Sequence, residues 1–211
     1  MILNRENILN CYPWMKDEER QFIISSDYDG IICASLLNHY KKWKLVGYYD
    51  MESIWLSKEA KKNKNEIIWI DLNILPVQGR AVGGHIISIK DEKIEGFNTS
   101  CNPNIIAGLN SLDFDKKFPM STILFLMWIY QIQIPKKIMS KMLIIHSDSA
   151  WLKYQHYTKN FSWWSDALKD FPWKWYFNNV DSKMFETRIS DVLYPQLNSI
   201  HAISGYSKLR S

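Results

Sequence analysis

Two aspartates that lie one residue apart, Asp27 and Asp29, are the first residues along this chain whose types and spacing could do chemistry. They follow an apolar run, QFIISS, and Gly30 comes directly after them. Such a pair can hold a divalent cation, can serve as a nucleophile with its general acid, or can form a polar turn. The D-x-D-G pattern alone leaves all three interpretations open.

Acidic residues also end later apolar runs of the chain. Asp71 ends EIIWID, Asp148 follows MLIIHS, and His85 lies near the start of GGHIISI. An acidic residue at the end of several apolar runs is more than a turn preference requires. Carboxylates with an imidazole suit Mn²⁺ or Mg²⁺, and two such ions can clamp both oxygens of a phosphoryl displacement. We therefore predict a metal site made by Asp27, Asp29, Asp71 and Asp148, with His85 beside it.

A parallel sheet would bring these side chains together. Four apolar runs have the length of buried strands, at residues 21–26, 44–50, 66–71 and 83–89. Helical or loop segments separate them, and the first of these is an amphipathic helix from Ile31 to near Trp43. This alternation predicts an α/β fold, with a parallel sheet flanked by helices. Ligands bind such sheets outside the carboxyl ends of the strands, where the acidic residues lie.

Beyond residue 100 the pattern becomes helical. The run STILFLMWIYQIQI, residues 121–134, predicts a buried helix that Pro135 stops. It is shorter than the roughly 20 residues that span a bilayer. We predict an α/β domain of residues 1–150 and a short helical, aromatic-rich extension of residues 151–211 that packs on it.

The composition is typical of a globular protein. The chain has 211 residues, of which 46% are hydrophobic, and a net charge of +4, which is a weak hint of a polyanionic partner. Its three widely spaced cysteines predict no disulfide framework, and its first residues lack a signal-peptide pattern. We expect a cytoplasmic protein with no membrane segment.

Taken in chain order, the motifs resemble those of the DHH phosphoesterase superfamily. The matching stretches, within residues 20–165, are SSDYDGIICASLL, IIWIDLNI, VGGHII, NPN and IIHSDSAWLKYQHYTKNFSWW. That superfamily includes RecJ-type exonucleases, oligoribonucleases and family II inorganic pyrophosphatases. The resemblance implies a parallel-sheet domain that uses a pair of Mn²⁺ or Mg²⁺ ions to hydrolyse phosphoester or phosphoanhydride bonds.

The resemblance also implies roles for particular residues. Asp27 and Asp29 match the first motif, Asp71 matches the carboxylate that bridges the two ions, and Asp148 matches the fourth metal-binding aspartate. His85 matches the second histidine of the Asp-His-His motif, which usually contacts the substrate phosphate. His85 is therefore the residue that we expect to act in catalysis.

The chain departs from the family pattern at two motifs. Ser25 stands where the first motif normally has Asp or His, and a hydroxyl is a poor ligand for these ions. Gly83 and Gly84 replace the first two residues of Asp-His-His. We also expect the smaller domain that closes over the substrate in many DHH enzymes to be absent or reduced.

Two functions follow from this comparison. The first is a metal-dependent phosphodiesterase that acts on a nucleotide or a short single-stranded nucleic acid. The second is a catalytically impaired DHH-like protein that works as a binding or regulatory subunit.

A haloacid-dehalogenase-like phosphatase also begins with D-x-D-G, and in that interpretation Asp27 would be the nucleophile and Asp29 the general acid. That family prefers Thr or Val after the glycine, where this chain has Ile31.

Residues 151–177 are rich in aromatic side chains with interleaved lysines. Rings and cations together hold single-stranded nucleic acid by stacking and phosphate contact, so we predict that Lys153, Trp163 and Trp164 contact the substrate. The alternative is a packed helical cap, or a surface for a second copy or a partner protein. His146 is either an auxiliary metal ligand or a hydrogen-bonded core residue.

Overall fold

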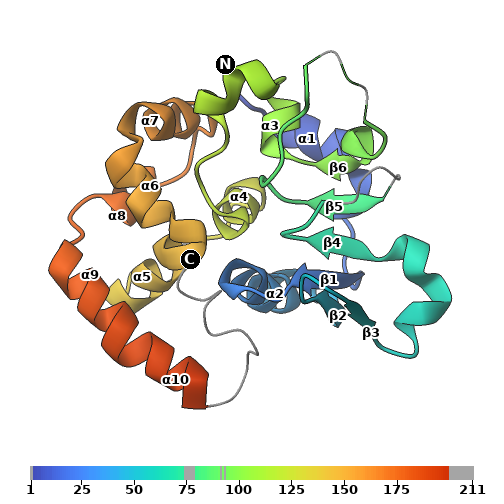
Figure 1. The fold of residues 1–211 in the computed structure, drawn as a ribbon, viewed down its shortest axis with the longest axis horizontal. Helices are drawn as coiled ribbons and strands as arrows, with labels where there is room; N and C mark the ends of the chain where they lie inside the picture. Colours follow the sequence, from blue (N-terminus) through green and yellow to red (C-terminus); the bar gives the residue numbers. More distant parts are fainter. Residues whose placement is uncertain (1, 74–78, 91, 93, 200–211) are drawn as a thin grey trace.

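The computed structural model of the chain describes residues 2–73, 79–90, 92 and 94–199 (Figure 1). It contains a six-stranded sheet with the order β3-β2-β1-β4-β5-β6. The strands are β1 (Gln21–Ser25), β2 (Lys44–Tyr49), β3 (Ile54–Leu56), β4 (Ile68–Ile70), β5 (Arg80–Val82) and β6 (Ser100–Cys101). All neighbours pair in parallel except β2 and β3, which are antiparallel. The predicted α/β fold with a mostly parallel sheet is confirmed.

Helices flank the sheet and make up most of the described chain after residue 120. The α-helices are α1 (Arg5–Cys11), α2 (Tyr28–Lys41), α3 (Pro103–Ile106), α4 (Thr122–Ile129), α5 (Ile138–His146), α6 (Ala150–His156), α7 (Thr158–Ala167), α8 (Trp173–Phe177), α9 (Ser182–Arg188) and α10 (Tyr194–Ser199). Shorter 3₁₀ turns are η1 (Pro13–Met15), η2 (Ala60–Glu66), η3 (Phe97–Thr99), η4 (Ser111–Lys116) and η5 (Ser147–Ser149), and η6 (Ile189–Leu193) is π-helical. In Figure 1 the arrowheads of β4 and β5 point toward the helical half of the molecule.

Helix α2 begins directly after β1, three residues earlier than the sequence predicts. Asp27 is its N-cap, and the Asp27 side chain accepts a 2.9 Å hydrogen bond from the N–H of Gly30. A Cβ atom at Gly30 would lie 2.2 Å from the carbonyl oxygen of Ser25. The glycine therefore allows the first turn of α2 to pack against the end of β1.

Helix α4 is buried along its whole length, as its uninterrupted apolar sequence predicts. It ends at Ile129, before Pro135, because the chain turns at Gln131, whose φ of 53° is left-handed. Helix α4 packs against α2, so the first turns of the two helices lie side by side. No helix in the described part of the chain is long and apolar enough to cross a membrane.

One large buried cluster joins the two halves of the molecule. It includes Leu3 and Ile24 of the sheet half, Phe125 of α4, and Trp164 and Tyr194 of the C-terminal helices. The other face of the sheet carries a smaller cluster, made of Ile23, Val46, Ala60 and Ile67. The aromatic-rich C-terminal helices therefore share a core with the α/β part.

One predicted strand is wrong. The run 83–89 was expected to be a strand, but the strand is β5, Arg80–Val82, and it ends just before Gly83. The glycine pair leads the chain away from the sheet, so His85 lies beyond the carboxyl end of a strand rather than at the start of one. The apolar run before Asp148 is the last part of helix α5.

Candidate metal centre

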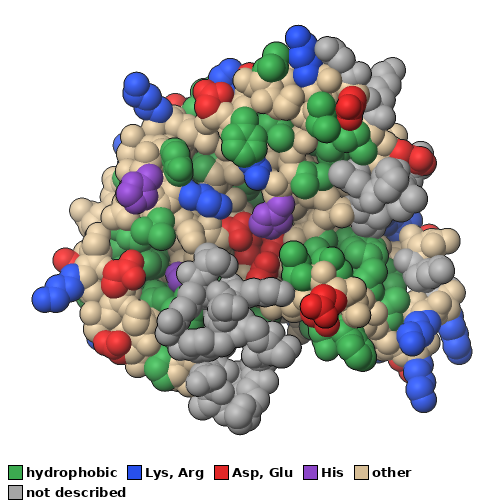
Figure 2. Space-filling model, viewed as in Figure 1, with side chains coloured by type: hydrophobic (Ala, Val, Ile, Leu, Met, Phe, Trp, Pro, Cys, Tyr) green, Lys and Arg blue, Asp and Glu red, His purple; other side chains and the backbone are tan. Residues whose placement is uncertain are grey.

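The acidic residues gather at the carboxyl edge of the sheet, between its central strands. The chain continues from β1 to β2 on one side of β1 and later to β4 on the other side, so the strand order reverses there. Open α/β sheets bind ligands at such a reversal. Figure 2 shows carboxylates (red) and a histidine (purple) together near the middle of this face.

Three predicted residues form a group that could hold a metal ion: Asp71, His85 and Asp148. One ligand atom from each lies within 4.8 Å of the others. His85 Nε2 is 2.6 Å from Asp71 Oδ1 and 3.7 Å from Asp148 Oδ2. Asp71 is fully buried at the bottom of the group, whereas the His85 side chain is 42% exposed. The group is therefore open on the histidine side.

Both carboxylates of this group come from residues with a left-handed backbone. Asp71, directly after β4, has a φ of 60°, and Asp148, inside η5, has a φ of 51°. Aspartate tolerates this conformation better than most residues, but it still costs energy. Such strain persists only where the surrounding structure enforces it, and here it places the two carboxylates in the same site.

Three side chains, those of His85, Thr122 and Ser25, lie within hydrogen-bond distance of the Asp71 carboxylate. Thr122 Oγ1 donates to its Oδ1 at 2.6 Å, and Ser25 Oγ lies 2.7 Å from its Oδ2. Ser25 Oγ also lies 2.8 Å from Asp27 Oδ1. Since a hydroxyl has one proton, it can donate to only one of these carboxylates at a time. The other short contact needs a proton on a carboxyl group, so the neighbouring carboxylates of Asp27 and Asp71 share a proton.

The pKa values of Asp71 and His85 indicate that negative charge is concentrated in this group. Burial raises the pKa of Asp71 to about 6, although its hydrogen bond to His85 opposes this change. The hydrogen bond to Asp71 raises the pKa of His85 to about 9 against the effect of burial, and the charges of Asp71, Asp148 and Asp27 add to it. At neutral pH the imidazolium of His85 is thus the cation that the carboxylates hold.

Asp27 stands at the edge of this group. Its Oδ1 accepts from the N–H of Gly30 and contacts Ser25 Oγ, which in turn contacts Asp71. The hydroxyl of Ser25 therefore bridges Asp27 and the buried carboxylate of Asp71. Ser25, which stands where the sequence comparison leads us to expect a metal ligand, is the residue that connects Asp27 with Asp71.

Asp29 has a different placement from the one that the sequence predicts. Its carboxylate accepts backbone N–H groups of Thr122 at 2.6 Å and Ile123 at 3.1 Å, and the thiol of Cys33 lies 3.7 Å from Oδ1. It is 1% exposed, and it lies outside the group of three. Ser121, the N-cap of α4, makes no side-chain cap of its own. Asp29, which lies on α2, therefore caps the start of α4. Its carboxylate interacts favourably with the positive end of the α4 helix dipole.

The loop that carries His85 is held by two asparagines, Asn102 and Asn104, which belong to the NPN sequence. Asn102 Nδ2 donates to the carbonyl of Ile86 at 2.9 Å, and Asn104 Nδ2 donates to the carbonyls of Gly84 at 2.8 Å and Ile86 at 3.0 Å. Both asparagines are fully buried. They fix the main chain on each side of His85. In the sequence, the NPN stretch that follows the glycine pair was the signal that could have indicated this role.

Replacing Asn104 with alanine is expected to destabilise the fold and loosen His85. The change leaves buried carbonyls and the N–H of Phe118, which donates to Asn104 Oδ1 at 2.6 Å, without partners. A loss of about 2 kcal/mol in the free energy of unfolding is expected. Urea unfolding measures it, with Asn98→Ala as a control outside this network. An unchanged midpoint would contradict the assigned role.

Gly84 lies in a position that has no room for a side chain. A Cβ atom there would lie 2.7 Å from Phe118 Cδ1 and 3.3 Å from Pro103 Cγ. The ring of Phe118 therefore occupies the space that a side chain at position 84 would need.

The predicted aromatic contacts divide into two kinds. Trp164 is fully buried, its indole N–H donates to the carbonyl of Lys116 at 2.7 Å, and its ring packs edge-on against Phe118. No surface of this ring is left for a substrate base. Trp163 is only partly buried and lines a surface cavity with Lys116. Lys153 is also partly exposed, on α6.

His146 is a partly buried residue whose ring is held by a hydrogen bond and by other rings. Its Nε2 lies 2.9 Å from the hydroxyl of Tyr194, and its ring packs against Tyr28 and Phe185. It is not part of the group formed by Asp71, His85 and Asp148.

Comparisons of this chain with protein-family models, with curated proteins and with solved structures found no match. The resemblance to the DHH superfamily therefore stays a prediction that rests on the quoted motifs, and the geometry of the site has to support a function by itself.

Proposed function

We propose that this protein is a metal-dependent phosphoesterase that hydrolyses phosphodiester bonds of a nucleotide or a short single-stranded nucleic acid. The observation that carries the proposal is the group of Asp71, His85 and Asp148 at the strand-order reversal of a parallel sheet. The ordered DHH-like motifs support the same reaction.

The residues of the group fit a divalent cation. Mn²⁺ binds readily to a set of two carboxylates and an imidazole. Mg²⁺ binds to the carboxylate oxygens of the same set. The buried carboxylate of Asp71 lies near Asp27 and Asp148, and the imidazolium of His85 is the cation that contacts it. The chemistry that an ion supplies is polarisation of a phosphate and a lower pKa of water.

The surrounding residues orient and neutralise the site. Thr122 and Ser25 hold the Asp71 carboxylate in place, and the half-exposed ring of His85 faces the opening. His85 has two distinct roles open to it, as an ion ligand through Nε2 or as a hydrogen-bond donor to the substrate phosphate. The resemblance favours the phosphate role, whereas its contacts with Asp71 and Asp148 favour the ligand role.

A single assay tests the proposal. The purified protein is mixed with bis-p-nitrophenyl phosphate or thymidine-monophosphate p-nitrophenyl ester, and release of p-nitrophenol is followed with Mn²⁺, Mg²⁺ or EDTA. We expect release that depends on the ion and is lost with EDTA. Folded protein that hydrolyses neither ester nor an oligonucleotide with any divalent ion would overturn the proposal.

The affinity for a divalent ion is expected to rise with pH between about 6 and about 9. An ion has to displace the proton of His85, whose pKa is about 9, and below pH 6 also that of Asp71. Calorimetric titration in buffers of different ionisation enthalpy should show about one proton released per ion near pH 7. An affinity that does not change over this range would assign His85 to the phosphate instead.

The ion-free protein is expected to respond to pH in the opposite direction. The folded pKa of His85 lies above its unfolded value of 6.5, so its contribution is complete below that pH and is lost as the pH rises to about 9. The melting temperature in EDTA should therefore fall from pH 6.5 to pH 9, while that in Mn²⁺ should not.

A second function keeps support from the same geometry. Asp27 and Asp29 cap α2 and α4, and the described residues offer one group of three ligands rather than a pair of ion sites. This arrangement favours a binding or regulatory subunit that has lost catalysis. Elemental analysis separates the two functions, because a catalytic protein should keep Mn²⁺ through gel filtration and an impaired one should not.

A further inference from the structure

Two lysines lie next to the candidate metal centre and outside its ligand group. Burial and the positive charge of Lys153 lower the pKa of Lys117, while the charge of Asp148 raises it. Lys117 follows η4, and Lys153 lies on α6, which begins directly after the turn that carries Asp148. Neither lysine forms an ion pair with any described carboxylate. Figure 2 shows basic side chains (blue) beside the central carboxylates and histidine.

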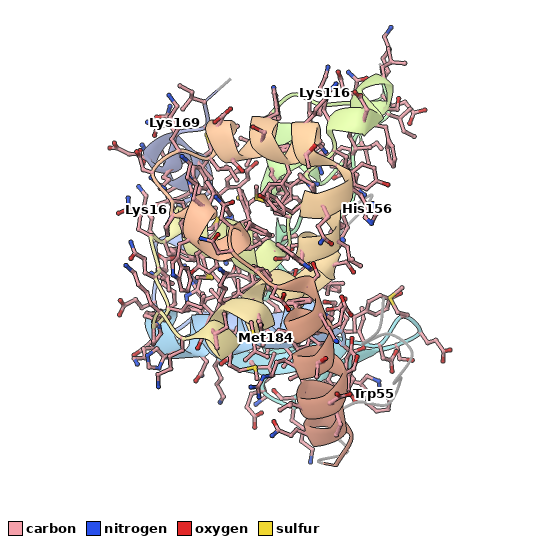
Figure 3. All side chains as sticks on the ribbon, turned by 90° about the vertical axis from the view of Figure 1, so that its left-hand side faces the viewer. Lys16, Trp55, Lys116, His156, Lys169 and Met184 are labelled. Atoms are coloured by element: carbon pink, nitrogen blue, oxygen red, sulfur yellow. The ribbon has the colours of Figure 1, made fainter. Side chains whose placement is uncertain are left out.

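A surface cavity of about 490 Å³ lies between η4 and the corner that joins α6 to α7. Its lining includes Asp115, Lys116, His156, Tyr157, Lys159 and Trp163. Figure 3 shows Lys116 and His156 on the same side of the molecule, from these two segments. Asn160 Nδ2 donates to the carbonyl of Lys117 at 2.8 Å, which ties the cavity wall to the lysine beside the metal centre.

Exposed aromatic rings accompany the cations on this surface. The side chains of Phe114 and Tyr157 are each 63% exposed, and Lys117 Nζ lies 5.7 Å from the centroid of the Phe114 ring. Rings left in water next to unpaired lysines are unfavourable in an isolated protein, but they suit a ligand that offers flat faces and negative charges in alternation.

The distance from the metal centre to the cavity fits such a ligand. Helix α6 has seven residues and is therefore about 10 Å long, with Asp148 before its start and Tyr157 after its end. Lys153 lies between them. A phosphate at the metal centre would thus be followed by lysines and then by aromatic rings.

We propose that this surface binds the part of a single-stranded nucleic acid that adjoins the scissile phosphate. In this subsite Lys117 and Lys153 contact the next phosphate, and the cavity receives the following base against Tyr157 and Trp163. The inference rests on the proposed function for the position of the scissile bond, and it goes further by giving the substrate more than one nucleotide. One carboxylate, Asp115, also lines the cavity, and Lys116 beside it is already paired with Asp113. We favour a nucleic acid over a protein partner because Lys117, Lys153 and Lys159 form no described ion pair and exposed rings lie on the same surface.

The test measures binding separately from hydrolysis. Fluorescence anisotropy of a short labelled oligothymidylate is recorded in EDTA, at several salt concentrations, with thymidine monophosphate as a competitor. Lys117→Ala and Lys153→Ala should each weaken binding about tenfold and reduce the slope of log affinity against log salt by about one. Tyr157→Ala should weaken binding about tenfold without changing the slope. Lys136→Ala, an exposed lysine before α5, is the matched control, and Lys117→Arg should restore binding.

The outcomes separate this inference from the proposed function. Lysine-dependent binding without hydrolysis in any divalent ion would support the subsite and overturn the phosphoesterase. Hydrolysis with unchanged affinity and salt slope in both lysine variants would overturn the subsite alone. Oligonucleotide binding no tighter than that of the mononucleotide would also overturn it.

Discussion

Replacing Asp71 with asparagine is expected to abolish ion binding and to lower phosphoesterase activity about a thousandfold while the fold remains intact. The amide keeps the size of the side chain, its oxygen can accept from Thr122 and His85, and its NH₂ group can donate to Ser25. Asparagine also tolerates the left-handed φ of 60° at this position. The ion-free variant should be at least as stable as the natural chain, because a buried carboxylate near other carboxylates has been removed.

Two melting curves check this prediction, one in EDTA and one in Mn²⁺. The natural chain should gain stability in Mn²⁺, since an ion that binds the folded state only stabilises it, and Asp71→Asn should gain none. Asp166→Asn, an exposed position on α7, serves as the control and should respond to Mn²⁺ like the natural chain. Retention of ion binding by Asp71→Asn would contradict the assignment of the metal centre.

Replacing Asp29 with alanine is expected to have the largest effect on stability, about 3 kcal/mol in the free energy of unfolding. The change leaves the N–H groups of Thr122 and Ile123 without an acceptor at the buried start of α4. Asp29→Asn should cost less, because its amide oxygen can still accept one of them. Burial and the charges of Asp71, Asp148 and Asp27 raise the pKa of Asp29, so part of the loss is offset when the carboxyl is removed.

Urea unfolding in EDTA measures this effect without any contribution from an ion. The same experiment distinguishes the two roles of Asp29, since a ligand would matter only when an ion is present. An unchanged unfolding midpoint in EDTA with a lost response to Mn²⁺ would return Asp29 to the ion-ligand role that the sequence predicts.

The fold was predictable because its strands are short apolar runs separated by turn residues. QFIIS, KLVGYY and IWI each form a strand of the parallel sheet. The strand before His85 was placed wrongly because β5 is only three residues long, and the apolar residues after the glycine pair resemble a strand by themselves. Local patterns cannot show that a run of this kind leaves the sheet to be held by Asn102 and Asn104.

The candidate site was predictable only where a side chain follows a strand. Asp71 and His85 meet because β4 and β5 are neighbours with parallel register. The sequence cannot show which distant group a carboxylate faces, and Asp29 faces backbone groups more than ninety residues away. The same limit applies to Trp164, whose burial depends on its packing against Phe118, and to Thr122, whose hydroxyl reaches Asp71 from the start of α4.

The clamp on the His85 loop has a consequence for how this site can change. Asn102 and Asn104 hold main-chain carbonyls, not the imidazole, so the loop keeps its course whatever side chain stands at position 85. The side chain at position 85 can therefore be replaced by another metal ligand or proton donor while the backbone of the loop stays the same. Substitution of His85 by Glu, Gln or Cys should give a set of folded proteins whose ion preferences differ, and the site could be retuned for another metal one residue at a time.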